Sequence, residues 1–224
     1  NVNEIHGFHV FPDMEVGNVG YKSGIYMASC DEIHLTINGR GGHGATPHQC
    51  IDPIMIGATI ITQIQQIVSR KCDPKIPCVL SFGHFEALGA TNVIPSKAIL
   101  KGTFRTMNET WRTEALALIE KQIKLIVESQ GATVDITISK GYPYLENNPK
   151  LTNESQFIAE HIFGKDKVHE LPIRLTSEDF AYYSQEIPGS FMRLGVRNES
   201  KGIIHGVHHP KFNIDDQALI VGME

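Results

Sequence analysis

Residues 31–38 read DEIHLTIN, an alternation of polar and apolar side chains that predicts a β-strand. Ile33, Leu35 and Ile37 would lie together on one face of that strand. The glycine-rich run GRGG at residues 39–42 should end it, because clustered glycines favour turns. A single half-buried strand is not stable by itself, so partner elements are expected further along the chain.

Two amphipathic helices are predicted downstream of this strand. Asp52 and Pro53 suit the N-cap and first turn of a helix whose apolar spacing continues to Val68. Thr106 and Glu109 match a capping box, which predicts that the second helix begins there. Both helices carry apolar residues at helical spacing and should therefore pack on a sheet.

Three further strands complete a recognisable order. They are predicted at residues 79–87, 98–106 and 133–139. The resulting order β-α-β-β-α-β across residues 31–139 predicts a ferredoxin-like sheet with two helices on one face.

The flanking sequence predicts the remainder of an α/β fold. Residues 1–28 are extended and punctuated by glycine, and residues 142–224 combine helical patterns with a compact strand near residues 190–196. We expect these two segments to form one α/β domain from which a lid of residues 29–141 projects. Both ends look unfinished, so we expect the chain to be part of a longer protein.

Composition excludes several classes of function. The net charge of -5 offers no basic surface for nucleic acid, and no apolar run has the roughly 20 residues that span a bilayer. Four cysteines are too few for a disulfide scaffold in a chain of this length. Unpaired thiols indicate a reducing compartment, so a cytoplasmic location is expected.

Histidines provide the first candidates for chemistry. His9 ends an extended apolar run, where a neutral imidazole could bind zinc or manganese, although a packed or surface histidine is the commoner case. A second group comprises His205, His208 and His209, with Asp215 just beyond as a carboxylate that could orient one of them. A solvated histidine-rich loop is an equally good interpretation of that group.

Two further sites lie within the predicted lid. His43 is surrounded by glycines that would let the backbone approach a ligand, and its imidazole could donate to an oxyanion. Asn92 and Arg105 flank the turn between two strands, Asn92 before it and Arg105 at the end of the next strand. Arginine suits bidentate capture of a carboxylate. A tight hairpin turn and a surface salt bridge are the simpler alternatives.

Read together, six segments resemble one family, the amidohydrolase branch of the two-metal peptidases. This branch contains hippurate hydrolase, auxin-conjugate hydrolases and N-acetyldiaminopimelate deacetylase, with aminoacylase and carboxypeptidase G as more distant relatives. The segments are GFHVFPDMEVGNVG (7–20), GRGGHGATPH (39–48), DPI (52–54), TNVIPSKAILKGTFRT (91–106), TSEDFAYYSQEIPGSFMRLG (176–195) and HHPKFNIDDQAL (208–219).

The resemblance implies a metallopeptidase-like α/β catalytic domain with an inserted ferredoxin-like βαββαβ lid domain, and roles for particular residues. His9 and His208 correspond to metal ligands, and His43 to the lid histidine that stabilises the oxyanion. Further positions correspond to substrate contacts: Asn92, Arg105 and, in the EDF motif, Glu178.

The implied cofactor is a pair of divalent metal ions, zinc or manganese first and cobalt or nickel as alternatives. The implied substrate is an N-acyl amino acid, and the implied partner is a second copy that pairs through the lid. The family pattern also has a Cys-Gly-His-Asp-type segment and a Glu-Glu pair that these 224 residues lack. The chain alone is therefore expected to be inactive. A dipeptidase or exopeptidase, or a non-catalytic dimerising or ligand-binding module, is the alternative function.

Overall fold

The computed structural model describes residues 2–224, which form two compact units. Unit 2 comprises Ala28–Tyr144 with Leu175–Ser177. Unit 1 comprises the described residues up to Met27, together with Leu145–Arg174 and Glu178–Glu224. No helix within residues 2–224 is long and apolar enough to cross a membrane.

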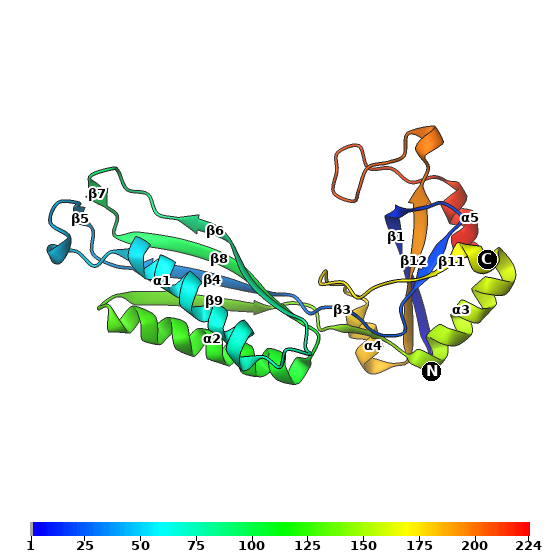
Figure 1. Ribbon diagram of the computed structural model, residues 1–224, viewed down its shortest axis with the longest axis horizontal. Helices are drawn as coiled ribbons and strands as arrows, with labels where there is room; N and C mark the ends of the chain where they lie inside the picture. The colour runs from blue at the N-terminus through cyan, green and yellow to red at the C-terminus, as the bar shows by residue number, and fades with distance from the viewer. Residues whose placement is uncertain (1) are drawn as a thin grey trace. The chain divides into compact units, whose positions relative to one another are not determined.

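Unit 2 is built on a four-stranded antiparallel sheet whose order is β6-β8-β4-β9 (Figure 1). The strands are β4 (Asp31–Asn38), β6 (Cys78–Glu86), β8 (Lys97–Thr106) and β9 (Thr133–Lys140). The helices α1 (Pro53–Gln66) and α2 (Glu109–Ser129) pack on one face. A two-stranded ladder of β5 (Gly42–His43) and β7 (Val93–Ile94) lies at one end. The predicted α/β class and inserted ferredoxin-like module are confirmed.

The alternation in residues 31–38 sets the core of unit 2. Ile33, Leu35 and Ile37 are at most 1% exposed, whereas Glu32 just before them is exposed and His34 and Thr36 between them are half-buried. These three side chains pack against apolar residues of both helices. Burying one face while leaving the other in contact with water is the arrangement that a period of two predicts.

The start of α2 differs from the predicted capping box. Asn108 is the N-cap, and its side-chain oxygen accepts a hydrogen bond from the Trp111 amide at 2.8 Å. Thr106 still belongs to β8, and its hydroxyl donates to the Pro77 carbonyl. Glu109 bonds Arg112 instead of the cap backbone. The prediction placed the cap two residues early because Asn and Thr are both good caps. The predicted Asp52 cap of α1 is confirmed, because the Asp52 carboxylate accepts a hydrogen bond from the Ile54 amide.

Unit 1 contains a sheet of order β1-β12-β2-β11 and a separate two-stranded ladder. The sheet strands are β1 (Ile5–Glu15), β2 (Val19–Tyr21), β11 (Val168–Glu170) and β12 (Gly189–Arg197). The ladder pairs β3 (Gly24–Met27) with β10 (Leu145–Asn147). The helices are α3 (Pro149–Phe163), α4 (Ala181–Glu186) and α5 (Gln217–Met223). Short turns of helix complete the chain at Pro47–Gln49, Ile67–Lys71, Lys165–Lys167 and Glu199–Lys201.

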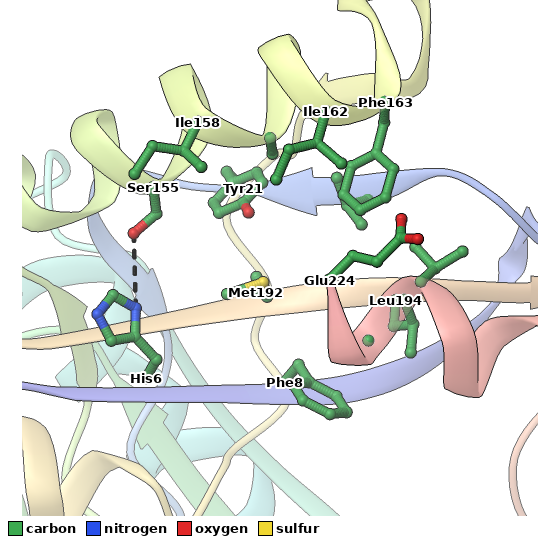
Figure 2. A pocket seen from close by; sticks show the side chains of 14 residues that line it. His6, Phe8, Tyr21, Ser155, Ile158, Ile162, Phe163, Met192, Leu194 and Glu224 are labelled. Atoms are coloured by element: carbon green, nitrogen blue, oxygen red, sulfur yellow. Dashed lines mark hydrogen bonds between the residues drawn. The ribbon is translucent and has the colours of Figure 1, made fainter.

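An apolar hollow of about 300 Å³ lies between α3 and one face of the unit 1 sheet (Figure 2). His6 and Phe8 of β1 line it. Because successive side chains of a strand point to opposite faces, His9, the residue after Phe8, faces away from the hollow. Burial at the hollow raises the pKa of Tyr21 to about 12. The remaining lining is apolar for the most part, and the candidate residues of unit 1 are not part of it.

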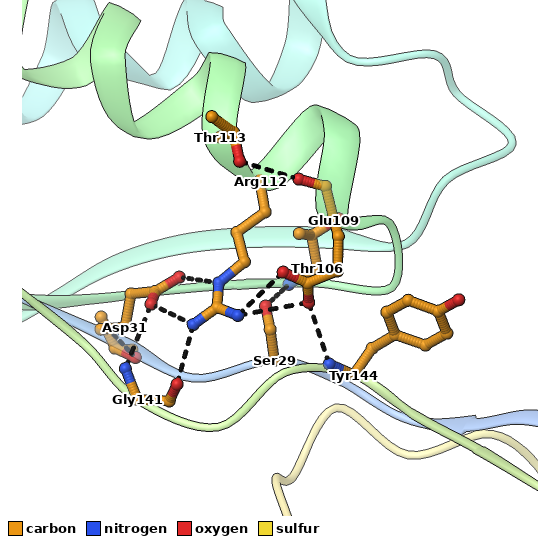
Figure 3. Close-up of polar contacts among 9 residues, drawn as sticks. Ser29, Asp31, Thr106, Glu109, Arg112, Thr113, Gly141 and Tyr144 are labelled. Carbon is orange, nitrogen blue, oxygen red and sulfur yellow. Dashed lines mark hydrogen bonds and ion pairs between the residues drawn. The ribbon is translucent and has the colours of Figure 1, made fainter. Parts of the chain in front are cut away.

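A buried ion network joins the two ends of unit 2 (Figure 3). The Arg112 guanidinium donates to both oxygens of Asp31, at 2.9 and 2.6 Å. It also donates to the Gly141 carbonyl and to the Glu109 carboxylate, each at 3.0 Å. Burial by itself would lower the pKa of Arg112, but the hydrogen bonds and charges of Asp31 and Glu109 outweigh burial and raise it. Because Asp31 begins β4 and Gly141 follows β9, the network ties the entry of the module to its exit.

We expect Asp31→Asn to lower the free energy of unfolding of unit 2 by about 3 kcal/mol, because the buried guanidinium would lose its bidentate partner. Trp111, the single tryptophan of the chain, is buried in this unit, so urea unfolding followed by its fluorescence is the measurement. The control is Lys124→Met, which breaks an exposed ion pair with Glu120 and should cost less than about 0.5 kcal/mol. Equal losses for the two variants would contradict the role of the network.

Candidate functional site

His9 lies on β1 with an exposed side chain and a defined tautomer. Its Nδ1 is 2.8 Å from the Val10 carbonyl oxygen. A carbonyl can only accept, so Nδ1 carries a proton, and a neutral ring then holds its lone pair on Nε2. An imidazole with this tautomer can bind a metal ion through Nε2 while the backbone holds the ring in place.

Glu178 is close to His9 on unit 1. Burial raises the pKa of Glu178, as does a hydrogen bond with Asp179, whereas the electrostatic effects of His9 and Arg193 act in the opposite direction. Arg193 of β12 is the partner of His9 in the parallel register, and its guanidinium donates to the Tyr26 hydroxyl at 3.1 Å. Sequence reasoning missed Arg193, because only the pairing of β1 with β12 brings it beside His9.

His208 has an unusual backbone. Its φ is +70°, and it is the one non-glycine residue among residues 2–224 with a positive φ. This conformation is costly for a side chain with a Cβ, and such residues are frequent at functional sites. The observation supports a special role for His208 without defining it.

The neighbouring histidines have other arrangements. The rings of His205 and His209 stack at 4.2 Å between centroids, nearly parallel. The Lys211 amide donates to Nδ1 of His209 at 3.0 Å, so the proton of this ring is on Nε2 when the ring is neutral. Burial, with the charges of His209 and Lys211, lowers the pKa of His205.

Asp215 does not orient a histidine, contrary to the prediction. Its carboxylate accepts hydrogen bonds from Lys201 Nζ at 2.9 Å and from the Gln217 amide at 3.1 Å, and it also bonds Asn198. The hydrogen bond from Lys201 is the main reason that the pKa of Asp215 lies below its usual range. Asp215 therefore fixes the base of the loop that carries His205, because Asn198 and Lys201 precede that loop.

The metal-ligand candidates suit a metal in type but not in number. His9 has a free lone pair, and imidazole and carboxylate groups are ligands that zinc and manganese accept. Residues 2–224, however, contain no group of three or more His, Cys, Asp or Glu side chains placed to hold an ion. A complete metal site is thus not assembled by the described part of the chain.

His43 lies at the β5–β7 end of unit 2 and has the opposite tautomer to His9. The Ala45 amide donates to Nδ1 of His43 at 3.0 Å. Because an amide N–H can only donate, Nδ1 holds the lone pair and a neutral ring carries its proton on Nε2. The side chain is exposed, so this Nε2–H is available to donate to a ligand oxygen.

The glycines around His43 serve the fold of the loop. A Cβ on Gly41 would lie 2.5 Å from the Ile94 carbonyl oxygen, and one on Gly42 would lie 2.7 Å from the Cys50 sulfur. We predicted that these glycines admit a ligand to the backbone. They instead admit the chain's own β7 segment and Cys50, because contacts this short leave no space for a side chain.

Asn92 and Arg105 are not neighbours. Asn92 lies beside His43, because the Gly44 amide donates to the Asn92 carbonyl at 2.8 Å. Arg105 lies at the other end of β8, where its guanidinium donates to the Leu175 carbonyl at 3.2 Å. Arg105 is eight residue steps along the extended strand from Lys97, which corresponds to roughly 26 Å. Unit 2 therefore presents His43 with Asn92 at one end and Arg105 near the other.

Comparison with known proteins finds one family over the whole chain. The description "Peptidase family M20/M25/M40" matches residues 1–224. Thermostable carboxypeptidase 2 of Saccharolobus solfataricus is 34% identical over 99% of the chain, and N-acetyldiaminopimelate deacetylase of Enterococcus faecalis is 33% identical over 99%. The chain spans 56% and 57% of the lengths of these two relatives.

A solved structure is also similar. The Bacillus subtilis YXEP protein, described as a dinuclear metal binding peptidase from the M20 family, superposes with a TM-score of 0.72 at 27% identity. The match covers 98% of this chain and 54% of that protein.

The two tautomers can be tested directly. At about pH 8, where an ordinary histidine is neutral, we expect His9 to be protonated on Nδ1 and His43 on Nε2. Long-range ¹H–¹⁵N correlation spectra of the chain distinguish the two forms. His209, whose Nδ1 also accepts from an amide, is the internal control and should resemble His43. The same tautomer at His9 and His43 would contradict the assignment.

The loop anchor can be tested by titration. The depressed pKa of Asp215 means that its carboxylate stabilises the fold above the unfolded-state pKa and that this contribution is lost as the pH falls through the folded-state pKa. Lys201→Met should move the pKa of Asp215 upward toward its ordinary value. Carboxyl ¹³C NMR between about pH 2 and pH 6 measures this shift. Lys211→Met removes a charge from the same loop without a bond to Asp215 and should leave that pKa in place.

Proposed function

The chain belongs to peptidase family M20/M25/M40, and on that premise we propose that the protein containing it is a metal-dependent hydrolase of N-acyl amino acids. The reaction would cleave the amide bond and release a carboxylic acid and a free amino acid. The matched relatives are longer than this chain, so the activity is proposed for the longer protein.

The observation that carries this proposal is the pair of opposite tautomers at His9 and His43. Nε2 of His9 is a free lone pair, as a metal ligand requires. Nε2 of His43 is a free N–H donor, as an oxyanion requires. Hydrogen bonds to the local backbone set both tautomers, so each ring is prepared for its role before any ligand binds.

His9 and His208 are the residues of this chain that we assign to the metal ions. Two bound divalent metals would supply an activated water and polarise the amide carbonyl. We propose zinc or manganese, with cobalt or nickel as alternatives, because all four accept imidazole and carboxylate ligands. The description of the YXEP protein as dinuclear metal binding supports the proposal. The remaining ligands would come from residues outside these 224.

The substrate's carboxylate is assigned to Asn92 and Arg105 of unit 2, for which we propose the role of a lid. The Arg105 guanidinium is half-buried, and its one described hydrogen bond is to the Leu175 carbonyl, which leaves N–H groups for a carboxylate. Glu178 would line the site beside His9. The side chain of His43 would steady the oxyanion that develops on the amide carbonyl.

The separation of His43 and Asn92 from Arg105 supports a homodimer. Arg105 lies roughly 26 Å along β8 from Lys97, which is at the end of the strand nearer His43 and Asn92, so a small N-acyl amino acid cannot contact both groups from a single copy of the module. We propose that one copy supplies Arg105 and the second copy supplies His43 with Asn92 to the same substrate. Pairing through the lid would then be a requirement for activity.

A second candidate function is an exopeptidase acting on the same type of bond. It is favoured by the similarity to thermostable carboxypeptidase 2, at 34% identity. The four cysteines, none in a disulfide, support the proposal of a cytoplasmic location for either enzyme.

We expect two substitutions to separate the proposed roles in the longer protein. His208→Ala should reduce bound metal and abolish hydrolysis of N-acetyl and N-benzoyl amino acids. His43→Ala should keep the metal but slow turnover by about 100-fold or more, the scale of a lost oxyanion donor. Elemental analysis and steady-state kinetics are the measurements.

His161→Ala is the control, because this exposed histidine of α3 bonds only its own helix. It should change neither the metal content nor the rate. Full metal content in His208→Ala would remove it from the ligands. A rate for His43→Ala within about threefold of the unsubstituted protein would remove His43 from the mechanism.

A further inference from the structure

Two thiols of unit 2 lie against each other where the first helical segment ends. Cys72 follows the helical turn Ile67–Lys71, and Cys78 begins β6, so five residues separate them in the sequence. The two thiols share a hydrogen bond. The thiol of Cys50, by contrast, donates to the Thr46 carbonyl at 3.7 Å.

The loop between the two thiols is tightly folded. The Ile76 amide donates to the Asp73 carbonyl at 2.9 Å, and the Lys75 amide donates to the Asp73 carboxylate at 2.9 Å. The Cys72 sulfur lies 3.7 Å from the Ile76 carbonyl oxygen, and Ile76 is two residues before Cys78. This turn therefore brings Cys72 back to the start of β6.

The sheet and α2 hold Cys78 from the other side. Cys78 pairs with Thr106 of β8 in the antiparallel register, and the indole N–H of Trp111 donates to its sulfur at 3.4 Å. Both thiols pack against the core of unit 2, yet both are only half-buried, so a small solute can reach them. Neither sulfur has to cross the fold to meet the other.

We propose that Cys72 and Cys78 form a reversible disulfide when the protein meets a peroxide, which makes this loop a redox-modification site of unit 2. The inference is independent of the proposed hydrolase activity. In a reducing compartment the bond would be transient, because exchange with other thiols reduces it again.

The reaction with hydrogen peroxide has two steps. The Cys72 thiolate attacks one oxygen, the O–O bond breaks, and the sulfur becomes a sulfenic acid. The departing hydroxide takes up the proton that Cys72 released and forms water. The Cys78 sulfur then attacks the sulfenic sulfur, and the S–OH oxygen leaves with the proton of Cys78 as a second water. Two thiols are thereby oxidised to one disulfide, and one peroxide is reduced to two waters.

The environment of the thiols sets the order of these steps. Burial raises the pKa of both thiols, that of Cys78 to about 11. The hydrogen bond between them acts to lower the pKa of Cys72 and to raise that of Cys78, so Cys78 is the donor. Cys72 is therefore the attacking thiol and Cys78 the resolving one. Because the thiolate is the reactive form, the reaction should be slow at neutral pH and faster as the pH rises.

The 224-residue chain carrying Cys30→Ser and Cys50→Ser tests the proposal, because Cys72 and Cys78 are then its only thiols. Excess hydrogen peroxide at about pH 8 should remove both free thiols together and leave a monomer lighter by two hydrogen atoms. Dithiothreitol should restore both thiols. Trp111, the single tryptophan, should lose fluorescence in the oxidised chain, because a disulfide beside an indole quenches it.

Two variants of this chain separate the two roles. With Cys78→Ser, Cys72 should gain oxygen atoms instead of forming a disulfide, and dithiothreitol should not restore it once it reaches the sulfinic acid. With Cys72→Ser, the remaining thiol should disappear at least about tenfold more slowly than the pair does, because the attacking thiol is gone.

The matched control carries Cys72→Ser and Cys78→Ser and retains Cys30 and Cys50. It should form no disulfide within one chain. Peptide mapping of the oxidised unsubstituted chain is an independent measurement if a variant fails to fold, and it should find Cys72 linked to Cys78.

Three results would overturn the inference. The first is survival of both thiols in the folded chain under peroxide treatment that oxidises the chain unfolded in urea. The second is separate oxidation of Cys72 and Cys78 to products that dithiothreitol does not reduce. The third is a set of disulfides that link different chains only.

Discussion

The bidentate ion pair between Arg112 and Asp31 is the interaction on which the organisation of this chain depends. A module inserted into another domain must begin and end at nearly the same point. The antiparallel pairing of β4 with β9 brings Asp31 opposite Lys140, and Arg112 then bonds Asp31 and the Gly141 carbonyl together. Removing one partner from such a buried pair is far more costly than losing an exposed pair, because the remaining charge stays without compensation.

The same antiparallel arrangement has a consequence for function. The chain enters unit 2 at the start of β4 and leaves it at the end of β9, so entry and exit lie at the same end of the sheet, and the turn between β7 and β8 lies at the opposite end. His43 and Asn92 are at the end with that turn, whereas Arg105 is near the end where the chain enters and leaves. The length of an extended strand therefore prevents one copy from bringing all three residues to one small molecule. The proposal of a second copy rests on this strand geometry together with the proposed roles of these residues.

In unit 1 the chemistry depends on which groups are already bonded within the protein. The backbone fixes the ring of His9 through Nδ1. Burial raises the pKa of Glu178, and the electrostatic effects of His9 and Arg193 lower it. Arg193 and Arg197 are engaged by partners inside the unit, whereas Arg174 is held by an aromatic ring that does not neutralise its charge.

The amino-acid sequence alone determined the elements and their order. The alternation around Ile33, the Asp52 cap and the apolar helix faces are short-range patterns, so the ferredoxin-like module could be predicted from them. The motifs also placed the chain in its family. The local pattern was less decisive where two nearby residues were equally suitable as helix N-caps: Asn108, and not Thr106, caps α2.

Only the tertiary structure decided which nitrogen of His9 and His43 is free, how far Arg105 lies from Asn92, and that Arg174 has no acidic partner among residues 2–224. Periodicity is set by adjacent residues, whereas proton position and charge pairing depend on groups that meet only after folding.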